Sequence, residues 1–200
     1  MTTTLITVGL IRHGTTEWNI AGRMQGQMDT ELAAVGIEQA ELLAHRLKSE
    51  LWDGIMSSDL IRARQTAQTI SNITGVPFLG EDSRLRERHF GQLEGTTLED
   101  RISRFGESWR EQELGLETDE ALLERWFSFF ADLEQAQRGK RILVVSHGGY
   151  IAPVLERIMG EPVASHLSNT SMTVMELTAD AVWNCHLLNC TAHLDKLNNM

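Results

Sequence analysis

Two apolar runs rich in β-branched residues lie at residues 5–11 and 141–146 of the chain. Runs of this length and composition predict strands that are buried on both faces, as in a parallel sheet. The first run is followed by Arg-His-Gly at residues 12–14, and the second by His-Gly-Gly at residues 147–149. Because ligands bind at the carboxyl ends of strands in open α/β sheets, both sets of side chains are expected at one binding edge.

Helical periodicity and short β-type runs account for most of the remaining chain. The expected helices cover residues 36–50, 60–73, 96–112, 119–137 and 150–159, and the expected strands 52–57, 76–79, 171–177 and 182–188, the last two as an antiparallel pair. Ser-Asp at residues 58–59 is expected to cap the helix that starts at residue 60. The order of strands and helices predicts a three-layer α/β/α fold, with a mostly parallel sheet and helices on both faces.

Length and composition favour one globular domain. The 200 residues suffice for one substantial domain, and 42% hydrophobic with 23% charged residues predicts a sizeable core. We expect a single domain over residues 1–200, in which residues 96–120 form a helical cap insertion. No apolar stretch approaches the roughly 20 residues of a membrane span. The N-terminus also lacks the features of a signal peptide, so a cytoplasmic location is expected.

The charge and cysteine content narrow the choice of partners. A formal net charge of −10 argues against nucleic acid or an anionic membrane as partner. It leaves room for a small anionic substrate, because a local group of cations reverses the field inside a cleft. Cys185 and Cys190 form neither a disulfide framework nor a metal site with suitable neighbours, so free thiols are expected.

Cationic side chains are expected to gather at the carboxyl edge of the predicted sheet. Arg12 and His13 end the first strand, Arg62 lies in the first turn of a later helix, and His147 follows the strand at residues 141–146. Two arginines and two histidines suit a phosphoryl group, because guanidinium groups bind its oxygens in pairs and keep their charge. A neutral His13 is able to attack phosphorus, and His147 is then expected to stabilise the charge in transfer.

A phosphoryl transfer of this kind also needs a proton for the leaving alkoxide. Glu87 is the candidate acid, since burial against Phe90 or the charge of a bound phosphate would keep it protonated near neutral pH. The alternative is that Glu87 forms a surface ion pair with the arginines around it. Asn19, Thr16 and Gly148 are the candidates for neutral contacts with the substrate, the first two having the alternative of a cap or turn role.

Four motifs, in their order along the chain, resemble those of the histidine phosphatase superfamily (phosphoglycerate mutase-like). They are Arg-His-Gly at 12–14 with Asn19, Ser-Asp-Leu-Ile-Arg-Ala at 58–63 with Gln-Thr-Ala at 65–67, Leu-Arg-Glu-Arg-His-Phe-Gly at 85–91 with Glu-Gly at 94–95, and Ser-His-Gly-Gly at 146–149. One such motif alone is weak, whereas four in order with compatible spacing are specific. The resemblance covers most of the chain and implies a phosphoglycerate mutase-like fold without a metal or organic cofactor.

The same resemblance implies roles for individual residues. It implies phosphorylation of His13 during turnover, a phosphate pocket formed by Arg12, Arg62 and His147 with Asn19, and Glu87 as proton donor.

The resemblance leaves two main activities open. Mutases of the family usually have tyrosine where Phe90 stands, lysine where Leu98 stands, and a pair of arginines in a longer insertion that residues 101–120 lack. Without these groups a second anionic end is held less well, and water more readily takes the phosphoryl group. We therefore expect a phosphomonoesterase acting on a small phosphorylated metabolite, with a cofactor-dependent phosphoglycerate mutase as the alternative.

Two further hypotheses, a phosphoprotein phosphatase and a phosphate-binding module without turnover, are less favoured than the phosphomonoesterase and the mutase. Simple binding gains little from the proton donor that the resemblance implies at Glu87. The sequence leaves the oligomeric state open between a monomer and a homodimer.

Overall fold

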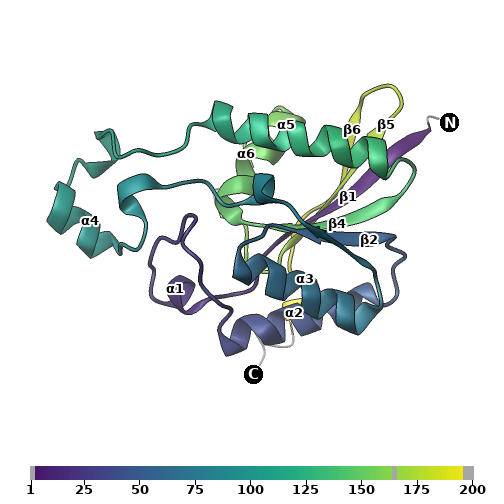
Figure 1. Ribbon diagram of the computed structural model, residues 1–200, viewed down its shortest axis with the longest axis horizontal. Coiled ribbons are helices and arrows are strands. Elements are labelled where there is room, and N and C mark those ends of the chain that lie inside the picture. The colour runs from purple at the N-terminus through teal and green to yellow at the C-terminus, as the bar shows by residue number, and fades with distance from the viewer. Residues whose placement is uncertain (1–2, 164–165, 196–200) are drawn as a thin grey trace.

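The computed structural model describes residues 3–163 and 166–195 and contains a six-stranded sheet between two layers of helices (Figure 1). The strands are β1 (Thr4–Arg12), β2 (Gly54–Ser57), β3 (Phe78–Glu81), β4 (Arg141–Ser146), β5 (Met172–Thr178) and β6 (Trp183–Cys190). The helices are α1 (Glu17–Ile20), α2 (Ala34–Leu47), α3 (Ile61–Thr74), α4 (Leu98–Phe105), α5 (Asp119–Ala136) and α6 (Gly148–Met159). Short 3-10 turns are η1 (Ser83–Leu85), η2 (Gly91–Leu93), η3 (Trp109–Glu111) and η4 (Ala192–Leu194).

The strand order is β3-β2-β4-β1-β5-β6. The first four strands run parallel, whereas β1 pairs with β5, and β5 with β6, in the antiparallel sense. The mostly parallel sheet and the late antiparallel pair are therefore confirmed. In the central pair Arg12 lies opposite Ser146, so the residues that follow β1 and β4 emerge side by side at one edge.

The core lies on both faces of the sheet. Helices α5 and α6 cover one face, and α2 and α3 the other (Figure 1). Along β4, Ile142 and Val144 pack with α5 and α6, whereas Leu143 and Val145 pack with α2 and α3. A strand covered on both faces needs apolar residues at successive positions. This explains the continuous apolar run in the sequence.

The helix expected over residues 96–112 is wrong in its length. Helix α4 begins after Thr97, whose side chain accepts a hydrogen bond from the N–H of Asp100, and it ends at Gly106. Gly106 has a φ of 79°, a conformation that favours glycine and stops an α-helix. The chain then continues through η3, so this part of the molecule consists of two short helical pieces.

The cap expected at residues 58–59 is wrong in its position. The N-cap residue of α3 is Leu60, whose apolar side chain accepts no hydrogen bond, and Oγ of Ser58 accepts one at 3.3 Å from the N–H of Leu60 itself. The N–H of Ile61 instead donates to Oδ1 of Asp29, at 2.7 Å, from the loop after α1. The aspartate of the expected pair binds Arg86. A carboxylate distant in sequence therefore satisfies the helix end.

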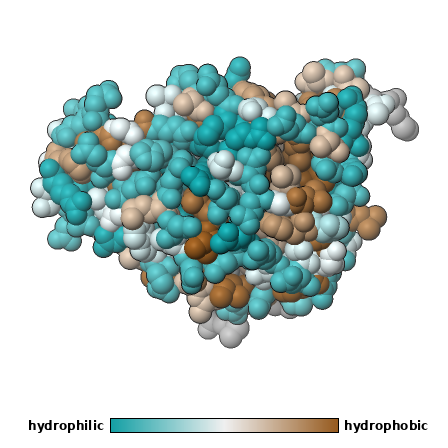
Figure 2. All heavy atoms as spheres, viewed as in Figure 1, coloured by the Kyte–Doolittle hydropathy of each residue, from teal (hydrophilic) through white to brown (hydrophobic). Residues whose placement is uncertain are grey.

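One face of the molecule is mainly polar. On the face seen in Figure 2, hydrophilic residues cover most of the area and hydrophobic ones gather in small groups. Among the described residues, no helix has the length and apolar character needed to cross a membrane. Within the same residues, no three histidine, cysteine or acidic side chains are grouped so that they would hold a metal ion.

Candidate active site

The two candidate histidines meet at the carboxyl edge of the sheet. His13 follows β1 and His147 follows β4, and the N–H of His13 donates to the carbonyl oxygen of Ser146 at 2.9 Å. Their ring centroids lie 5.1 Å apart with the ring planes tilted by 57°. Both side chains are buried. Two residues more than a hundred positions apart thus share one site because their strands are neighbours.

The imidazole of His13 is fixed through one of its nitrogens. Nδ1 lies 2.7 Å from the carbonyl oxygen of Gly14. Because a carbonyl oxygen only accepts, Nδ1 carries the hydrogen, and Nε2 of the neutral ring keeps its lone pair. Burial holds the pKa of His13 well below its usual value, and the charges of Arg62 and Arg12 act in the same direction. This ring is therefore neutral and has a free nucleophilic nitrogen at neutral pH.

His147 differs because neither of its ring nitrogens has a partner among the protein atoms. Its side chain is fully buried, and burial followed by the charge of Arg62 keeps its pKa well below the usual range. Buried polar groups in native proteins are nearly always hydrogen-bonded. An imidazole in this state is suited to bonding a ligand.

The loop after α1 holds Arg62 in place. Its two terminal nitrogens donate to the carbonyl oxygens of Met28, at 2.8 Å, and Gly26, at 2.7 Å. Burial lowers the pKa of Arg62 to about 10, so the side chain stays charged at neutral pH. Its Nε is buried without a protein partner.

Arg12 is held in a similar way by a different segment. One terminal nitrogen donates to the carbonyl oxygen of Leu167 and lies 3.2 Å from Nε2 of His166. Its Nε, like that of Arg62, is buried without a protein partner. Arg62 thus donates both terminal nitrogens, and Arg12 one of them, to main-chain carbonyl groups, and the Nε of each arginine is left without a protein partner.

Glu87 is a buried carboxyl group bonded to the main chain. Oε1 accepts from the N–H of Arg88 at 2.8 Å, and Oε2 from the N–H of Gly149 at 3.1 Å. Burial raises the pKa of Glu87, and these hydrogen bonds together with the charges of Arg62 and Arg12 oppose the rise. The group therefore keeps its proton more readily than an exposed glutamate.

Two glycines at the start of α6 make room for these groups. A Cβ at position 148 would lie 3.2 Å from Nε of Arg12. A Cβ at position 149 would lie only 2.9 Å from Oε1 of Glu87. Gly148 and Gly149 thus allow the arginine and the carboxyl group to approach the helix end closely. Gly148, expected to contact substrate, borders Arg12.

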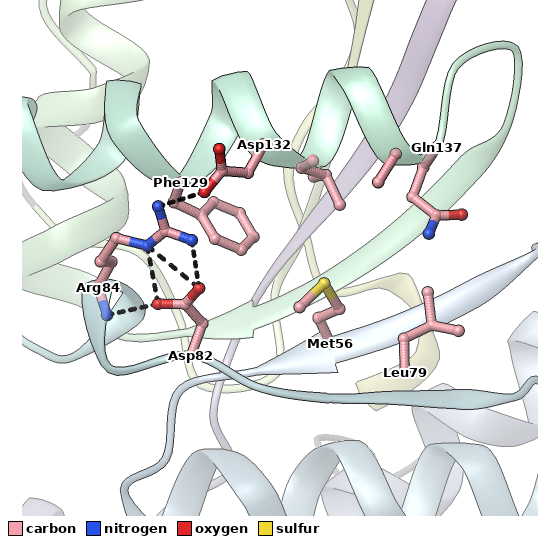
Figure 3. Close-up of a pocket in the computed structure, with 9 residues that line it drawn as sticks. Met56, Leu79, Asp82, Arg84, Phe129, Asp132 and Gln137 are labelled. Atoms are coloured by element: carbon pink, nitrogen blue, oxygen red, sulfur yellow. Dashed lines mark hydrogen bonds and ion pairs between the residues drawn. The ribbon is translucent and has the colours of Figure 1, made fainter.

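The three arginines that flank Glu87 in sequence bind other carboxylates. Arg84 binds Asp82 and Asp132, both at 2.7 Å, Arg86 binds Asp59 at 2.5 Å, and Arg88 binds Asp119 at 2.5 Å. Figure 3 shows Arg84 between Asp82 and Asp132, beside the ring of Phe129. A surface ion pair between Glu87 and these arginines is therefore wrong.

Thr16 and Asn19 form a capping box at the start of α1. The hydroxyl of Thr16 accepts from the N–H of Asn19 at 3.1 Å, and Oδ1 of Asn19 accepts from the N–H of Thr16 at 3.1 Å. The Thr16 hydroxyl also binds Oε1 of Gln25, and the side chain is fully buried. Thr16 thus serves the local structure, whereas Asn19 lies at the surface of the site with its amide nitrogen outside the capping box.

Asn169 was not expected from the sequence. Its amide nitrogen donates to the carbonyl oxygen of His13 at 3.0 Å and lies 3.4 Å from Oδ1 of Asn19. It belongs to the turn before β5. Because β5 is antiparallel to β1, the start of β5 lies at the edge where β1 ends. In the sequence, the polar triplet Ser-Asn-Thr at 168–170 could have indicated this residue, but only once the direction of β5 was known.

Comparisons with known proteins agree with this fold and identify the family. The family model of the histidine phosphatase superfamily (branch 1) matches residues 8–191. A metal-independent phosphoserine phosphatase from Arabidopsis thaliana is 34% identical over 198 residues, which is 94% of this chain and 83% of that protein. A Yersinia pestis protein named "Probable phosphoglycerate mutase GpmB" is 33% identical over 208 residues, 96% of each chain. A solved mycobacterial glucosyl-3-phosphoglycerate phosphatase in complex with VO3 has 30% identity and a TM-score of 0.80, over 92% of this chain and 99% of that one.

This chain therefore belongs to the histidine phosphatase superfamily, branch 1. It is an enzyme of this phosphatase and mutase group, as the four motifs predicted.

Proposed function

We propose that this enzyme is a phosphomonoesterase that hydrolyses small phosphorylated metabolites through a phosphohistidine on His13. One observation carries the proposal. Four buried nitrogens of this site have no protein partner in the described residues: Nε of Arg12, Nε of Arg62 and both ring nitrogens of His147. An unpaired buried polar group costs about 1–3 kcal/mol. The Nε–H groups of the two arginines and the one N–H of the neutral His147 ring are donors for the oxygens of a phosphoryl group, and the two guanidinium groups stabilise the charge of those oxygens.

In the first step Nε2 of His13 attacks phosphorus. The N–P bond forms, the P–O bond to the alcohol breaks, and Glu87 gives its proton to the leaving oxygen. In the second step water attacks phosphorus, the N–P bond breaks, and the Glu87 carboxylate takes the proton of the water. Inorganic phosphate leaves, and both side chains return to their starting states. Arg12, Arg62 and His147 bind the phosphoryl oxygens throughout.

We place the alcohol half of the substrate against the 96–120 segment, which we propose as a cap. A cavity of about 250 Å³ lies between this segment and the chain around Phe90. Its lining residues are Met24, Phe90, Leu93, Trp109, Arg110, Gln112, Leu114 and Leu116. Phe90 connects the cavity with the site, because its Cζ lies 3.2 Å from the Cβ position of Gly149. This mainly apolar lining with one arginine supports small phosphorylated metabolites as the substrate class.

A phosphoglycerate mutase is the second candidate, and the Yersinia pestis relative favours it. The apolar Phe90 and Leu98 favour hydrolysis, since neither side chain binds a second anionic group. An assay with 3-phosphoglycerate and a bisphosphate primer separates the two activities. Phosphate release faster than formation of 2-phosphoglycerate supports the phosphatase, and the reverse ratio supports the mutase.

The phosphohistidine is tested by rapid-quench labelling with a phosphate monoester. Wild-type protein is expected to give an acid-labile, base-stable phosphoryl label, and His13→Ala to give neither label nor turnover of p-nitrophenyl phosphate. His186→Ala is the matched control, because His186 is exposed on β6 and binds Glu176. Undiminished turnover by His13→Ala would rule out the proposed nucleophile.

A further inference from the structure

The main chain of the segment that carries Glu87, residues 84–90, is hydrogen-bonded by Arg125 of the neighbouring helix α5. A terminal nitrogen of Arg125 donates to the carbonyl oxygens of Arg84, at 2.6 Å, and Arg86, at 3.1 Å. These carbonyl groups belong to the residues just before Glu87. Because a guanidinium group is planar and rigid, two bonds from one nitrogen fix the main chain there closely.

Glu117 holds both Arg125 and the other side of the same segment. Nε and a terminal nitrogen of Arg125 donate to the two oxygens of Glu117, at 2.8 and 2.9 Å. One of these oxygens also lies 3.2 Å from the N–H of His89, and the N–H of Glu117 donates to the carbonyl oxygen of His89 at 2.8 Å. The Arg125–Glu117 pair is therefore hydrogen-bonded to the main chain on both sides of Glu87.

The pair is also packed against α6, which contacts the carboxyl group of Glu87. The guanidinium group of Arg125 lies over the ring of Tyr150, 4.9 Å from its centroid. The preceding residue, Gly149, donates its N–H to Oε2 of Glu87. The side chains of Arg125 and Glu117 are only 22% and 13% exposed, and both partners of the pair are thus sheltered, whereas the carboxylate partners of Arg88 and of the Arg84–Asp132 pair are 63% and 69% exposed. A pair this sheltered holds its geometry better than an exposed ion pair.

From these contacts we infer that Arg125, oriented by Glu117, is a positioning residue for the proton donor Glu87. It touches no reacting atom. It fixes the main chain on either side of Glu87, so that the carboxyl group stays where the leaving oxygen forms. This inference rests on the proposed function, in which Glu87 protonates the leaving alcohol.

A misplaced proton donor has a signature that a general loss of structure does not share. An alcohol of high pKa needs protonation as it leaves, whereas a weakly basic phenolate departs without it. The experiment measures kcat/KM for a series of phosphate monoesters, from alkyl phosphates through phenyl phosphate to 2,4-dinitrophenyl phosphate. kcat/KM reports the first phosphoryl transfer and is independent of the hydrolysis of the phosphohistidine.

Arg125→Lys is the decisive variant. Lysine keeps the positive charge, which also acts on His147, but it lacks the fork that bonds Glu117 and both carbonyl groups. We expect kcat/KM to fall by about 100-fold for alkyl phosphates, as for a donor displaced by an ångström. For the dinitrophenyl ester we expect a loss of less than about threefold. Glu117→Gln should give the same pattern with a smaller amplitude.

Two variants make the result interpretable. Asp132→Asn breaks another contact between α5 and the same segment, the 2.7 Å pair with Arg84, in which Asp132 is 69% exposed. It should leave the dependence on the leaving group unchanged. Glu87→Gln supplies the pattern expected when the proton donor is lost.

The outcomes distinguish a failure of the positioning role of Arg125 from a failure of the proton-donor role of Glu87. A steep dependence in Glu87→Gln and Arg125→Lys, with a normal one in Asp132→Asn, supports the inference. A steep dependence in Glu87→Gln with a uniform loss in Arg125→Lys overturns the inference alone. A flat response in Glu87→Gln overturns the proton-donor role and the inference together.

Discussion

Arg12 and Arg62 at the sheet edge are held differently from Arg110 in the 96–120 segment. At the carboxyl edge of the sheet, Arg12 and Arg62 are buried and donate to main-chain carbonyl groups of neighbouring loops. In the 96–120 segment, Arg110 is exposed and lies over the ring of Trp109, 4.2 Å from its centroid. A cation bonded to the main chain keeps one position, whereas an exposed cation on an aromatic ring retains side-chain freedom.

This difference suggests a division of labour within the proposed function. The phosphoryl group is common to every substrate, and a fixed set of donors serves it best. The alcohol half varies from one metabolite to the next, and an adaptable wall accommodates that variation. Changes at the sheet edge should therefore affect all substrates alike, and changes in the 96–120 segment should affect them selectively.

Arg62→Lys tests the fixed region and should have the largest effect. The charge is kept, but the fork that reaches Gly26 and Met28 is lost. Removal of one preorganised donor costs about 10²–10³-fold in rate, and we expect this loss in kcat/KM for every phosphate monoester. Arg64→Lys is the control, because Arg64 lies on the same helix in a half-exposed pair with Glu81. A loss confined to some substrates would contradict the division of labour.

Gly149→Ala tests whether the proton donor also belongs to the fixed region. The new methyl group would lie 2.9 Å from Oε1 of Glu87 and must displace the carboxyl group. We expect kcat to fall by about 10- to 100-fold with little change in KM, as for a misplaced catalytic group. Gly148→Ala should instead raise KM, because its methyl group would meet Arg12, which we propose binds the phosphate. Steady-state kinetics of both variants against one substrate distinguish the two effects.

The fixed region could be predicted from the sequence because its residues follow apolar strands directly. Residues 12–14 and 147–149 each end a run that is buried on both faces, and parallel neighbours present their ends at one edge. Asn169 and Arg125 escaped prediction because their roles arise from tertiary contacts. Asn169 reaches His13 only because β5 runs antiparallel, and Arg125 acts through carbonyl groups 39 and 41 residues away.

The 96–120 segment was less predictable for a different reason. Helix α4 presents few buried residues to the sheet and packs in a small cluster of its own around Trp109. Its periodicity therefore says little about its end, which Gly106 decides. The helix expected over residues 96–112 runs through this glycine, although a glycine in the left-handed conformation commonly ends a helix.

Arg110→Met tests the adaptable region and should have a selective effect. Methionine keeps an apolar side chain beside Trp109 and removes the charge that faces the cavity. For monoesters that carry a carboxylate, such as phosphoserine, we expect kcat/KM to fall by about tenfold, in the range of an exposed charged contact. For p-nitrophenyl phosphate we expect no change. Equal losses for both substrates would place Arg110 in the fixed region instead.

The smallest expected effect is on the pH dependence of stability, which should differ between the sheet edge and the 96–120 segment. Burial holds the pKa values of His13 and His147 well below the ordinary histidine pKa of about 6.5, whereas residues 96–120 contain no histidine. Below about pH 6.5 the unfolded chain therefore binds protons that the folded chain does not, and the free energy of unfolding falls with falling pH. Each such histidine contributes about 1.4 kcal/mol per pH unit.

His147→Asn removes one of these groups. Urea unfolding between about pH 7 and pH 5 should show a shallower loss of stability than in wild type, by the slope of one proton. The same measurement on Arg110→Met should give the wild-type slope, because that change touches no buried histidine. An unchanged slope in His147→Asn would mean that His147 is protonated in the folded state, and the neutral, fixed site proposed at the sheet edge would then be wrong.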